Sequence, residues 1–139
     1  MKILILGAGQ VGTSLAKFLS KDKANDLTIV DRDADKLSNL QRKLDIKTVV
    51  GNAAYPTVLE LADIQSMDMV IAVTVSDERN MLACQLAHTL YKVDKKIARI
   101  RTAEFLKNED LFAPYAIPID FVITPENIVT DYIKGIVEV

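Results

Sequence analysis

The sequence predicts a doubly wound α/β domain built on a parallel sheet. Short aliphatic runs alternate with helical patterns, a glycine-rich loop follows the first run directly, and an acidic residue ends the second run. The apolar runs are nearly continuous, as expected of strands that helices cover on both faces. We therefore expect six parallel strands in the order 3-2-1-4-5-6, with right-handed crossovers and a ligand crevice at their carboxyl ends.

The predicted elements alternate regularly along the chain. The strands are expected at residues 2–6, 27–31, 47–50, 69–74, 97–101 and 120–124. The helices are expected at residues 11–21, 34–44, 56–62, 77–92, 103–112 and 125–137. In chain order, the first helix has an apolar side that includes Leu15, and Asp33 fits the N-cap of the second. Pro56 suits the first turn of the third, Ser76 can cap the fourth, and Pro125 suits the start of the last.

Composition indicates one ordinary globular domain over residues 1–139. Half of the residues are apolar and the formal net charge is −2, with no basic run longer than Lys95-Lys96, which argues against nucleic-acid binding. Cys84 is the only cysteine, so an internal disulfide is impossible and a reducing compartment is expected. The apolar runs are too short for a membrane span, and the first one is a strand rather than a signal peptide.

The loop at residues 7–12 has the G-x-G-x-x-G spacing of a dinucleotide-binding turn. Gly7 permits a tight turn, Gly9 lets the backbone approach a pyrophosphate, and Gly12 allows close packing of helix and sheet. The pyrophosphate would lie at the N-terminus of the following helix, where backbone N–H groups lack partners. Asp31 ends the second strand at the position that accepts hydrogen bonds from the adenosine ribose hydroxyls. The pattern predicts a bound dinucleotide or adenine nucleotide.

Further polar residues follow the other strands. The turn Gly51-Asn52-Ala53 comes after the third strand, on the adenosine side. Thr74 ends the fourth strand across the crevice and is the better ligand candidate there, because Ser76 and Asp77 are equally well explained as helix caps.

Two arginines, Arg99 and Arg101, lie on one face of the fifth strand. Arginine is rare in a buried strand, so we expect a ligand-facing role, with a structural ion pair to Asp77 or Glu78 as the alternative.

Two other spacings suggest chemistry that we reject. Tyr91 and Lys95 have the Tyr-x-x-x-Lys spacing of short-chain dehydrogenases, but the expected upstream serine is missing and the pair falls at a lysine-rich helix end. Cys84 and His88 are spaced i, i+4 as two metal ligands could be, but the chain has no other cysteine or histidine to complete a site.

Taken together, several segments resemble the TrkA family of regulatory subunits of Trk/Ktr potassium-uptake systems, also called RCK or KTN domains. The resemblance covers essentially the whole chain, and the Ser-Asp-Glu-x-Asn motif with the Ala-Arg-Ile-Arg strand is far more specific than the glycine loop alone. The segments that carry it are Gly7-Ala8-Gly9-Gln10-Val11-Gly12, Gly51-Asn52-Ala53, Ala72-Val73-Thr74-Val75-Ser76-Asp77-Glu78-Arg79-Asn80-Met81 and Ile97-Ala98-Arg99-Ile100-Arg101.

The resemblance implies a Rossmann-like lobe that binds NAD(H), or ATP or ADP in some members, and gates a membrane-embedded potassium transporter without catalysing a reaction. It implies a cytosolic location, peripheral on the cytoplasmic face of the membrane. The residues expected at the ligand are Gly7, Ala8, Gly9, Gln10, Val11, Gly12, Asp31, Arg32, Asn52, Ala53, Thr74, Val75 and Arg99. Asn52 departs from the carboxylate that many relatives carry. The chain is expected to be a single N-terminal lobe.

Two other functions compete with regulation. The glycine loop alone would fit an NAD-dependent oxidoreductase, but we find no second domain and no credible proton-exchanging group. A nucleotide-binding subunit of an unrelated complex is the other alternative. The helix expected at 125–137 has a broad apolar surface, so we expect a homodimer through this helix, with packing on its own sheet in a monomer as the alternative. The resemblance implies that such dimers assemble into a higher oligomer.

Overall fold

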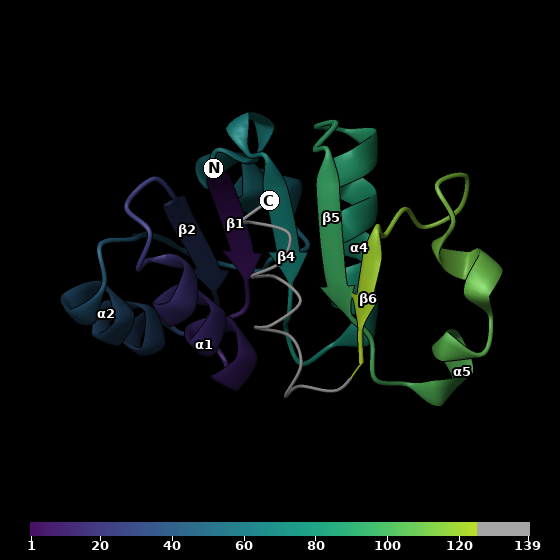
Figure 1. Ribbon diagram of the computed structural model, residues 1–139, viewed down its shortest axis with the longest axis horizontal. Coiled ribbons are helices and arrows are strands. Elements are labelled where there is room, and N and C mark those ends of the chain that lie inside the picture. The colour runs from purple at the N-terminus through teal and green to yellow at the C-terminus, as the bar shows by residue number, and fades with distance from the viewer. Residues whose placement is uncertain (125–139) are drawn as a thin grey trace.

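The computed structural model describes residues 1–124 and has the predicted sheet at its centre (Figure 1). Six strands, all parallel, lie in the order β3-β2-β1-β4-β5-β6, which confirms the predicted topology. The strands are β1 Lys2–Leu6, β2 Asp26–Asp31, β3 Lys47–Val50, β4 Met69–Ala72, β5 Lys95–Arg99 and β6 Phe121–Ile123.

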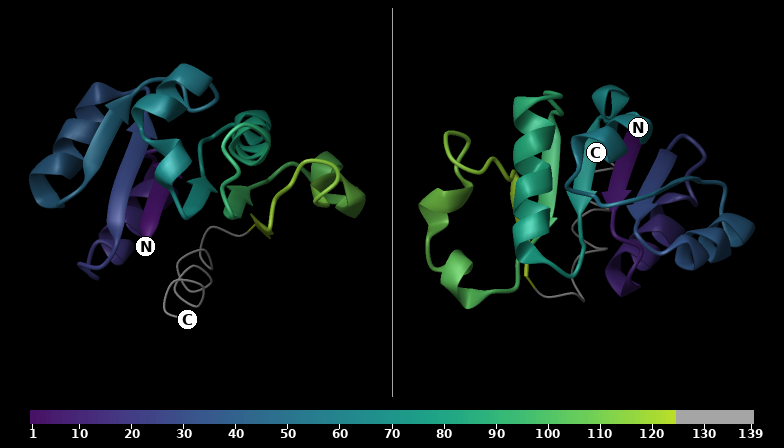
Figure 2. Two further views of the ribbon diagram at one scale, coloured as in Figure 1. Left: turned by 90° about the horizontal axis from the view of Figure 1, so that it is seen from above. Right: turned by 180° about the vertical axis from the view of Figure 1, so that it is seen from behind.

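Helices cover both faces of the sheet. The α-helices are α1 Gln10–Leu19, α2 Ala34–Lys43, α3 Pro56–Leu61, α4 Asp77–Thr89 and α5 Ala103–Leu106, and two 3₁₀ turns lie at Ile64–Ser66 and Glu109–Phe112. The two views of Figure 2 show α1 and α2 on one face, α3 and α4 on the other, and α5 beyond the β6 edge. None of the helices within residues 1–124 is long and apolar enough to cross a membrane. The helix predicted at 125–137 lies outside the described residues.

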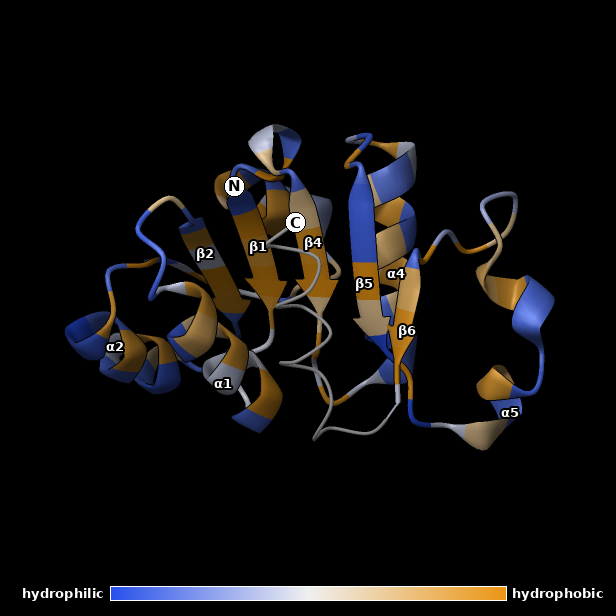
Figure 3. Ribbon diagram, viewed as in Figure 1, coloured by the Kyte–Doolittle hydropathy of each residue, from blue (hydrophilic) through white to orange (hydrophobic). Residues whose placement is uncertain are grey.

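The alternation of side chains along the strands builds two cores. Ile3 and Ile5 of β1 point into the core beneath α1 and α2, whereas Leu4 and Leu6 point into the core beneath α3 and α4. All four side chains are completely buried, and Figure 3 shows hydrophobic residues along most of the sheet and a mixture of hydrophobic and hydrophilic residues along the helices. This double burial explains the near-continuous apolar runs of the sequence.

Strand β5 begins and ends two residues earlier than predicted. At its end, the Arg101 N–H donates to the Asp77 carboxylate at 3.1 Å instead of extending the sheet. At its start, Lys96 is buried in the strand because its Nζ donates to the carbonyl oxygens of Val93 and Asp94 at 2.8 and 3.0 Å and lies 3.5 Å from the Asp120 carboxylate. A charged side chain is therefore tolerated in the strand because all its donors face oxygen.

The helix predicted over 103–112 is broken into α5 and a 3₁₀ turn at Glu109–Phe112. The Asn108 side chain donates from Nδ2 to the Glu104 carbonyl oxygen at 3.0 Å, the acceptor that the Asn108 N–H would use in a continuous helix. That N–H bonds to Phe105 O at 3.1 Å instead. Competition by an asparagine side chain thus ends the helix.

Candidate functional site

A cavity of about 370 Å³ opens at the carboxyl ends of β1, β2, β4 and β5, where the strand order reverses. Its walls come from five loops that the topology brings together. The lining residues are Gly7, Gly9, Gln10, Val30, Asp31, Arg32, Lys36, Gly51, Ala53, Val73, Thr74, Val75, Arg79 and Arg99. The crevice thus gathers nine of the thirteen residues predicted at the ligand. Ala8, Val11, Gly12 and Asn52 are not part of its wall.

The three glycines of the loop have distinct physical roles. Gly7 has φ +114°, and a Cβ there would lie 2.9 Å from the Val73 carbonyl oxygen. A Cβ at Gly12 would lie 1.8 Å from the Gly7 carbonyl oxygen, so only glycine lets α1 pack this close to the loop. A Cβ at Gly9 would meet no protein atom within 4 Å and would project into open space. Gly9 therefore leaves room for an external group, which fits the pyrophosphate role predicted for it.

Asp31 fixes the shape of this loop. Its Oδ2 accepts a hydrogen bond from the Ala8 N–H at 2.7 Å, and its Oδ1 accepts one from the Asp33 N–H at 2.8 Å. Each carboxylate oxygen keeps a second acceptor position, since a carboxylate offers about four, and Asp31 lines the crevice. The carboxylate can therefore hold the glycine loop and accept ribose hydroxyls at the same time. Ala8 contributes through its backbone rather than through the cavity wall.

The side of the crevice where the sequence predicts the adenosine is formed after β2 and β3. Arg32 and Lys36 line it, as do Gly51 and Ala53. The Asn52 side chain instead closes a local turn, with Oδ1 accepting from the Ala54 N–H at 2.9 Å. Asn52 thus shapes the turn that presents Ala53 to the cavity.

On the opposite side, Asn80 organises the wall. It is completely buried in the first turns of α4. Its Oδ1 accepts from the Thr74 N–H at 2.9 Å and from the Thr74 hydroxyl at 2.6 Å. Its Nδ2 donates to the carbonyl oxygens of Thr74 at 3.1 Å and Arg99 at 2.9 Å. The Thr74 hydroxyl, predicted as a ligand contact, therefore lines the cavity with its proton directed to Asn80.

Ser76 and Asp77 have the capping roles that the sequence left open. Ser76 Oγ accepts from the Arg79 N–H at 3.1 Å as the N-cap of α4. The Asp77 carboxylate accepts the backbone N–H groups of Arg101 and Thr102, the latter at 2.7 Å. Burial raises the pKa of Asp77, but hydrogen bonds from Thr102 and Arg101 and the charge of Arg101 outweigh it, so the pKa lies below its ordinary value.

Arg99 and Arg79 give this end of the crevice positive charge. Arg99 is 7% exposed at the end of β5 and lines the cavity, whereas Arg101 is exposed beyond the strand. Burial lowers the pKa of Arg99, Arg101 adds to the shift and Asp77 opposes it. An arginine titrates far above neutrality, so Arg99 stays charged. Arg99 thus lines the crevice, and Asp77 accepts hydrogen bonds from the backbone N–H groups of Arg101 and Thr102.

The two rejected spacings lie away from the crevice. Tyr91 lies near the amino end of β5, and its hydroxyl donates to Glu60 Oε2 at 2.7 Å. Burial and the hydrogen bond and charge of Glu60 raise the pKa of Tyr91 to about 12. Cys84 is buried with its Sγ 3.8 Å from the Ile97 carbonyl oxygen, and burial raises its pKa to about 12, whereas His88 is exposed. Cys84 and His88 do not share a surface.

Six residues that line or build the crevice were not predicted at the ligand: Val30, Lys36, Gly51, Val73, Arg79 and Asn80. Arg79 and Asn80 lie in a segment already recognised as polar, so their positions five and six residues after Thr74 were an available signal. The sequence gives no such signal for Lys36, because a lysine in the first turn of a surface helix is ordinarily solvated.

Sequence comparison places the chain in a family. The TrkA-N domain model matches residues 3–125. The chain is 53% identical over 138 residues to the Trk system potassium uptake protein TrkA of Halomonas elongata and 50% identical over 139 residues to that of Vibrio alginolyticus. These alignments cover 99% of this chain and 30% of each relative, so the chain spans under a third of their length.

Solved structures share the fold. The TrkA-N domain of inner membrane protein ybaL from Escherichia coli has a TM-score of 0.77 at 18% identity, covering 99% of this chain and 94% of that one. The GsuK RCK domain has a TM-score of 0.72 at 26% identity, covering 99% of this chain and 28% of that one. The GsuK channel has also been solved bound to NAD, with a TM-score of 0.71 at 20% identity over 88% of this chain and 21% of that one. With its sequence match over nearly the whole length and this shared fold, the chain belongs to the TrkA-N domain family.

Proposed function

We propose that the crevice binds NAD(H) and that the domain regulates a potassium-uptake transporter in response to this ligand. The observation that carries the proposal is the junction of the glycine loop with Asp31. The open space at Gly9 suits a pyrophosphate, and the Asp31 carboxylate, already bonded to Ala8 and Asp33, suits the ribose hydroxyls. The α1 N-terminus beside them favours negative charge.

The family supports the regulatory part of the proposal. Its curated relatives are named for potassium uptake, and GsuK, a structural neighbour, is described as a channel bound to NAD. We propose a membrane-embedded transporter of the Trk/Ktr type as partner, with this domain peripheral on its cytoplasmic side. The domain then acts by binding the ligand with different affinity in two states of the assembly, and not by catalysis.

Arg79 and Arg99 bear on the choice between ligands. A cationic wall opposite Asp31 stabilises the pyrophosphate of NAD(H), and it can equally stabilise the phosphates of ATP or ADP. The adenosine half is common to all these molecules. We place NAD(H) first because the crevice extends beyond the glycine loop to Thr74 and Val75, where a second nucleoside would lie.

The test is a set of calorimetric titrations of the 139-residue chain with NADH, NAD+, NADPH and ATP. We expect NADH to bind and to be displaced by NAD+. In parallel, NADH oxidation is followed at constant protein concentration with mixed aldehydes and ketones. Absence of binding by all four nucleotides overturns the ligand assignment, and steady NADH turnover overturns the regulatory role in favour of an oxidoreductase.

A further inference from the structure

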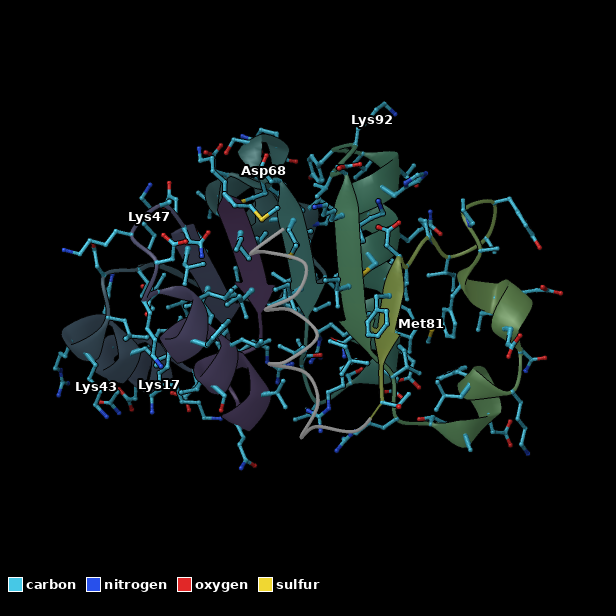
Figure 4. All side chains as sticks on the ribbon, viewed as in Figure 1. Lys17, Lys43, Lys47, Asp68, Met81 and Lys92 are labelled. Atoms are coloured by element: carbon cyan, nitrogen blue, oxygen red, sulfur yellow. The ribbon has the colours of Figure 1, made fainter. Side chains whose placement is uncertain are left out.

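A second groove lies beside the crevice, between α1 and α2. It encloses about 430 Å³, and its charged lining consists of Lys17, Lys36 and Lys43, with Thr13, Ser14 and Asn39 between them. We call it the lysine groove. Figure 4 shows Lys17 on α1 and Lys43 on α2 side by side along one edge of the molecule. Within residues 1–124, no aspartate or glutamate contributes to its lining.

The charges in the lysine groove are not balanced internally. Across residues 1–124, no carboxylate lies within 4.0 Å of the three ammonium groups. The groove is thus locally positive, although the net charge of the chain is −2. The three ammonium groups repel one another. An anion bound in the groove would be attracted to them and would reduce this repulsion.

Helix stability explains two of the lysines but not the third. Lys17 and Lys43 lie in the last turns of α1 and α2, where a cation interacts favourably with the helix dipole. Lys36 lies in the first turn of α2, where the same dipole disfavours a cation. The helix dipole therefore does not explain a lysine at this position.

The lysine groove is continuous with the nucleotide crevice. Gly9, Gln10 and Lys36 line both spaces, so an anion in the groove would lie next to the phosphates of a nucleotide in the crevice. Asp31 stands on the crevice side and disfavours a phosphate on the adenosine ribose itself. The crevice and the lysine groove together thus suit two separate anions better than a single dinucleotide with a phosphate on its adenosine ribose.

We propose that the lysine groove is a binding site for a solute that carries two or more phosphate groups, separate from the dinucleotide. Lysine ammonium groups act as point charges with flexible stems, so three of them accommodate a phosphate chain without requiring a fixed geometry. Where the crevice holds NAD(H) as proposed above, the two anions compete for Lys36 and repel each other. Each ligand then weakens the other by the same factor.

The experiment uses sodium tripolyphosphate as the probe, titrated calorimetrically into the full chain at low ionic strength. We expect the double variant Lys17→Gln, Lys43→Gln to bind it roughly tenfold or more weakly, with a shallower salt dependence. The charge-preserving Lys17→Arg, Lys43→Arg variant should retain binding. The matched control Lys23→Gln, Lys107→Gln removes the same charge from exposed positions outside the groove and should change affinity little.

NADH and NADPH are titrated against the same proteins. If tripolyphosphate does not bind but the glutamine variant lowers NADPH affinity relative to NADH, the phosphate is the 2′-phosphate of the dinucleotide and the separate-ligand proposal is overturned. The site is also overturned if the groove variant and the control variant lose tripolyphosphate affinity equally. It is overturned as well if the groove variant changes neither tripolyphosphate binding nor NADPH binding. If NADH fails to bind the unmodified chain while tripolyphosphate binds as expected, the proposed function fails and the lysine groove stands.

Discussion

Asn80 donates a hydrogen bond from Nδ2 to the carbonyl oxygen of Arg99 at 2.9 Å, across 19 positions of the sequence. The same side chain makes three hydrogen bonds to Thr74, so one buried amide holds the ends of β4 and β5 at a fixed separation. Thr74 and Arg99 both line the crevice. Asn80 therefore sets the distance between Thr74 and Arg99 in the wall of the crevice, although Asn80 is not part of the lining.

Replacing Asn80 by aspartate should destabilise the fold and weaken nucleotide binding. The carboxylate keeps the acceptor for Thr74 but removes both amide donors and directs negative charge at two carbonyl oxygens. We expect a loss of about 1–3 kcal/mol in the free energy of unfolding, measured in urea. The control Gln41→Glu makes the same change on an exposed residue of α2. Unchanged stability and NADH affinity in Asn80→Asp would remove Asn80 from this role.

The glycine loop offers a matched pair of substitutions. Gly9→Val should fold normally and lose NADH binding, because its side chain projects into the cavity and meets no protein atom. Gly12→Ala should instead lose stability, because its Cβ would lie 1.8 Å from the Gly7 carbonyl oxygen. Circular dichroism with thermal melts separates the two effects, and calorimetry measures binding. A folded Gly9→Val variant with full NADH affinity would show that the phosphates lie elsewhere.

Asp31 should make the crevice prefer NADH to NADPH, because its carboxylate accepts a free 2′-hydroxyl and repels a phosphate. Arg32 beside it works against this preference. Since Asp31 also holds the Ala8 and Asp33 N–H groups, the informative variant is Asp31→Asn, which keeps one acceptor oxygen. We expect NADH binding to weaken by about 1–3 kcal/mol and the preference over NADPH to shrink. Tighter NADPH than NADH binding by the unmodified chain contradicts the ribose assignment.

The Asp77 carboxylate should make stability depend on pH in the acid range. Its pKa is lower in the folded chain than the ordinary value of about 3.9, so its contribution is present above that value and is lost as the pH falls through the folded-state pKa. Asp77→Asn should cost about 1–3 kcal/mol in unfolding free energy at neutral pH, and the difference from the unmodified chain should shrink in acid. Urea unfolding from pH 7 downward measures it, with Glu78→Gln as the exposed control. A difference independent of pH refutes the assignment.

Assembly is the remaining expectation, and it concerns residues outside the described range. We propose a two-fold homodimer through 125–137, which carries the apolar residues Ile128, Val129, Tyr132, Ile133, Ile136 and Val137. Sedimentation of the intact chain at tens of micromolar should show a dimer, and Ile133→Asp with Ile136→Asp should give a monomer. A monomeric unmodified chain rejects the dimer, and a dimeric variant moves the interface elsewhere.

The sheet order and the crevice position could be predicted because they depend on local patterns. Apolar runs, a glycine loop and an acid at a strand end are each visible within a few residues. The position of Asn80 close to Thr74 was visible in the sequence, but its hydrogen bond to Arg99 was not, because only the packing of α4 against β5 brings the two residues together.

Some predicted boundaries of helices and strands were wrong for a similar reason. Asn108 ends α5 through one side-chain bond to Glu104, a competition that apolar spacing does not reveal. The burial of Lys96 in β5 likewise depends on carbonyl oxygens and an aspartate supplied by neighbouring loops. Periodicity predicts where an element lies, whereas polar contacts decide where it stops.

The close approach of the Val73 backbone to Gly7 has a consequence for the order of events during synthesis. The glycine loop leaves the ribosome early, yet the Val73 backbone that leaves no room for a Cβ at Gly7 comes 66 positions later, where β4 pairs beside β1. A nascent chain that consists only of β1, α1 and β2 therefore has the glycine loop and Asp31, but it has only one wall of the crevice. Contacts this distant in sequence form slowly. We therefore expect a nucleotide to bind only once the sheet is complete, so that it would stabilise the finished domain and would not act as a template for folding of the first half.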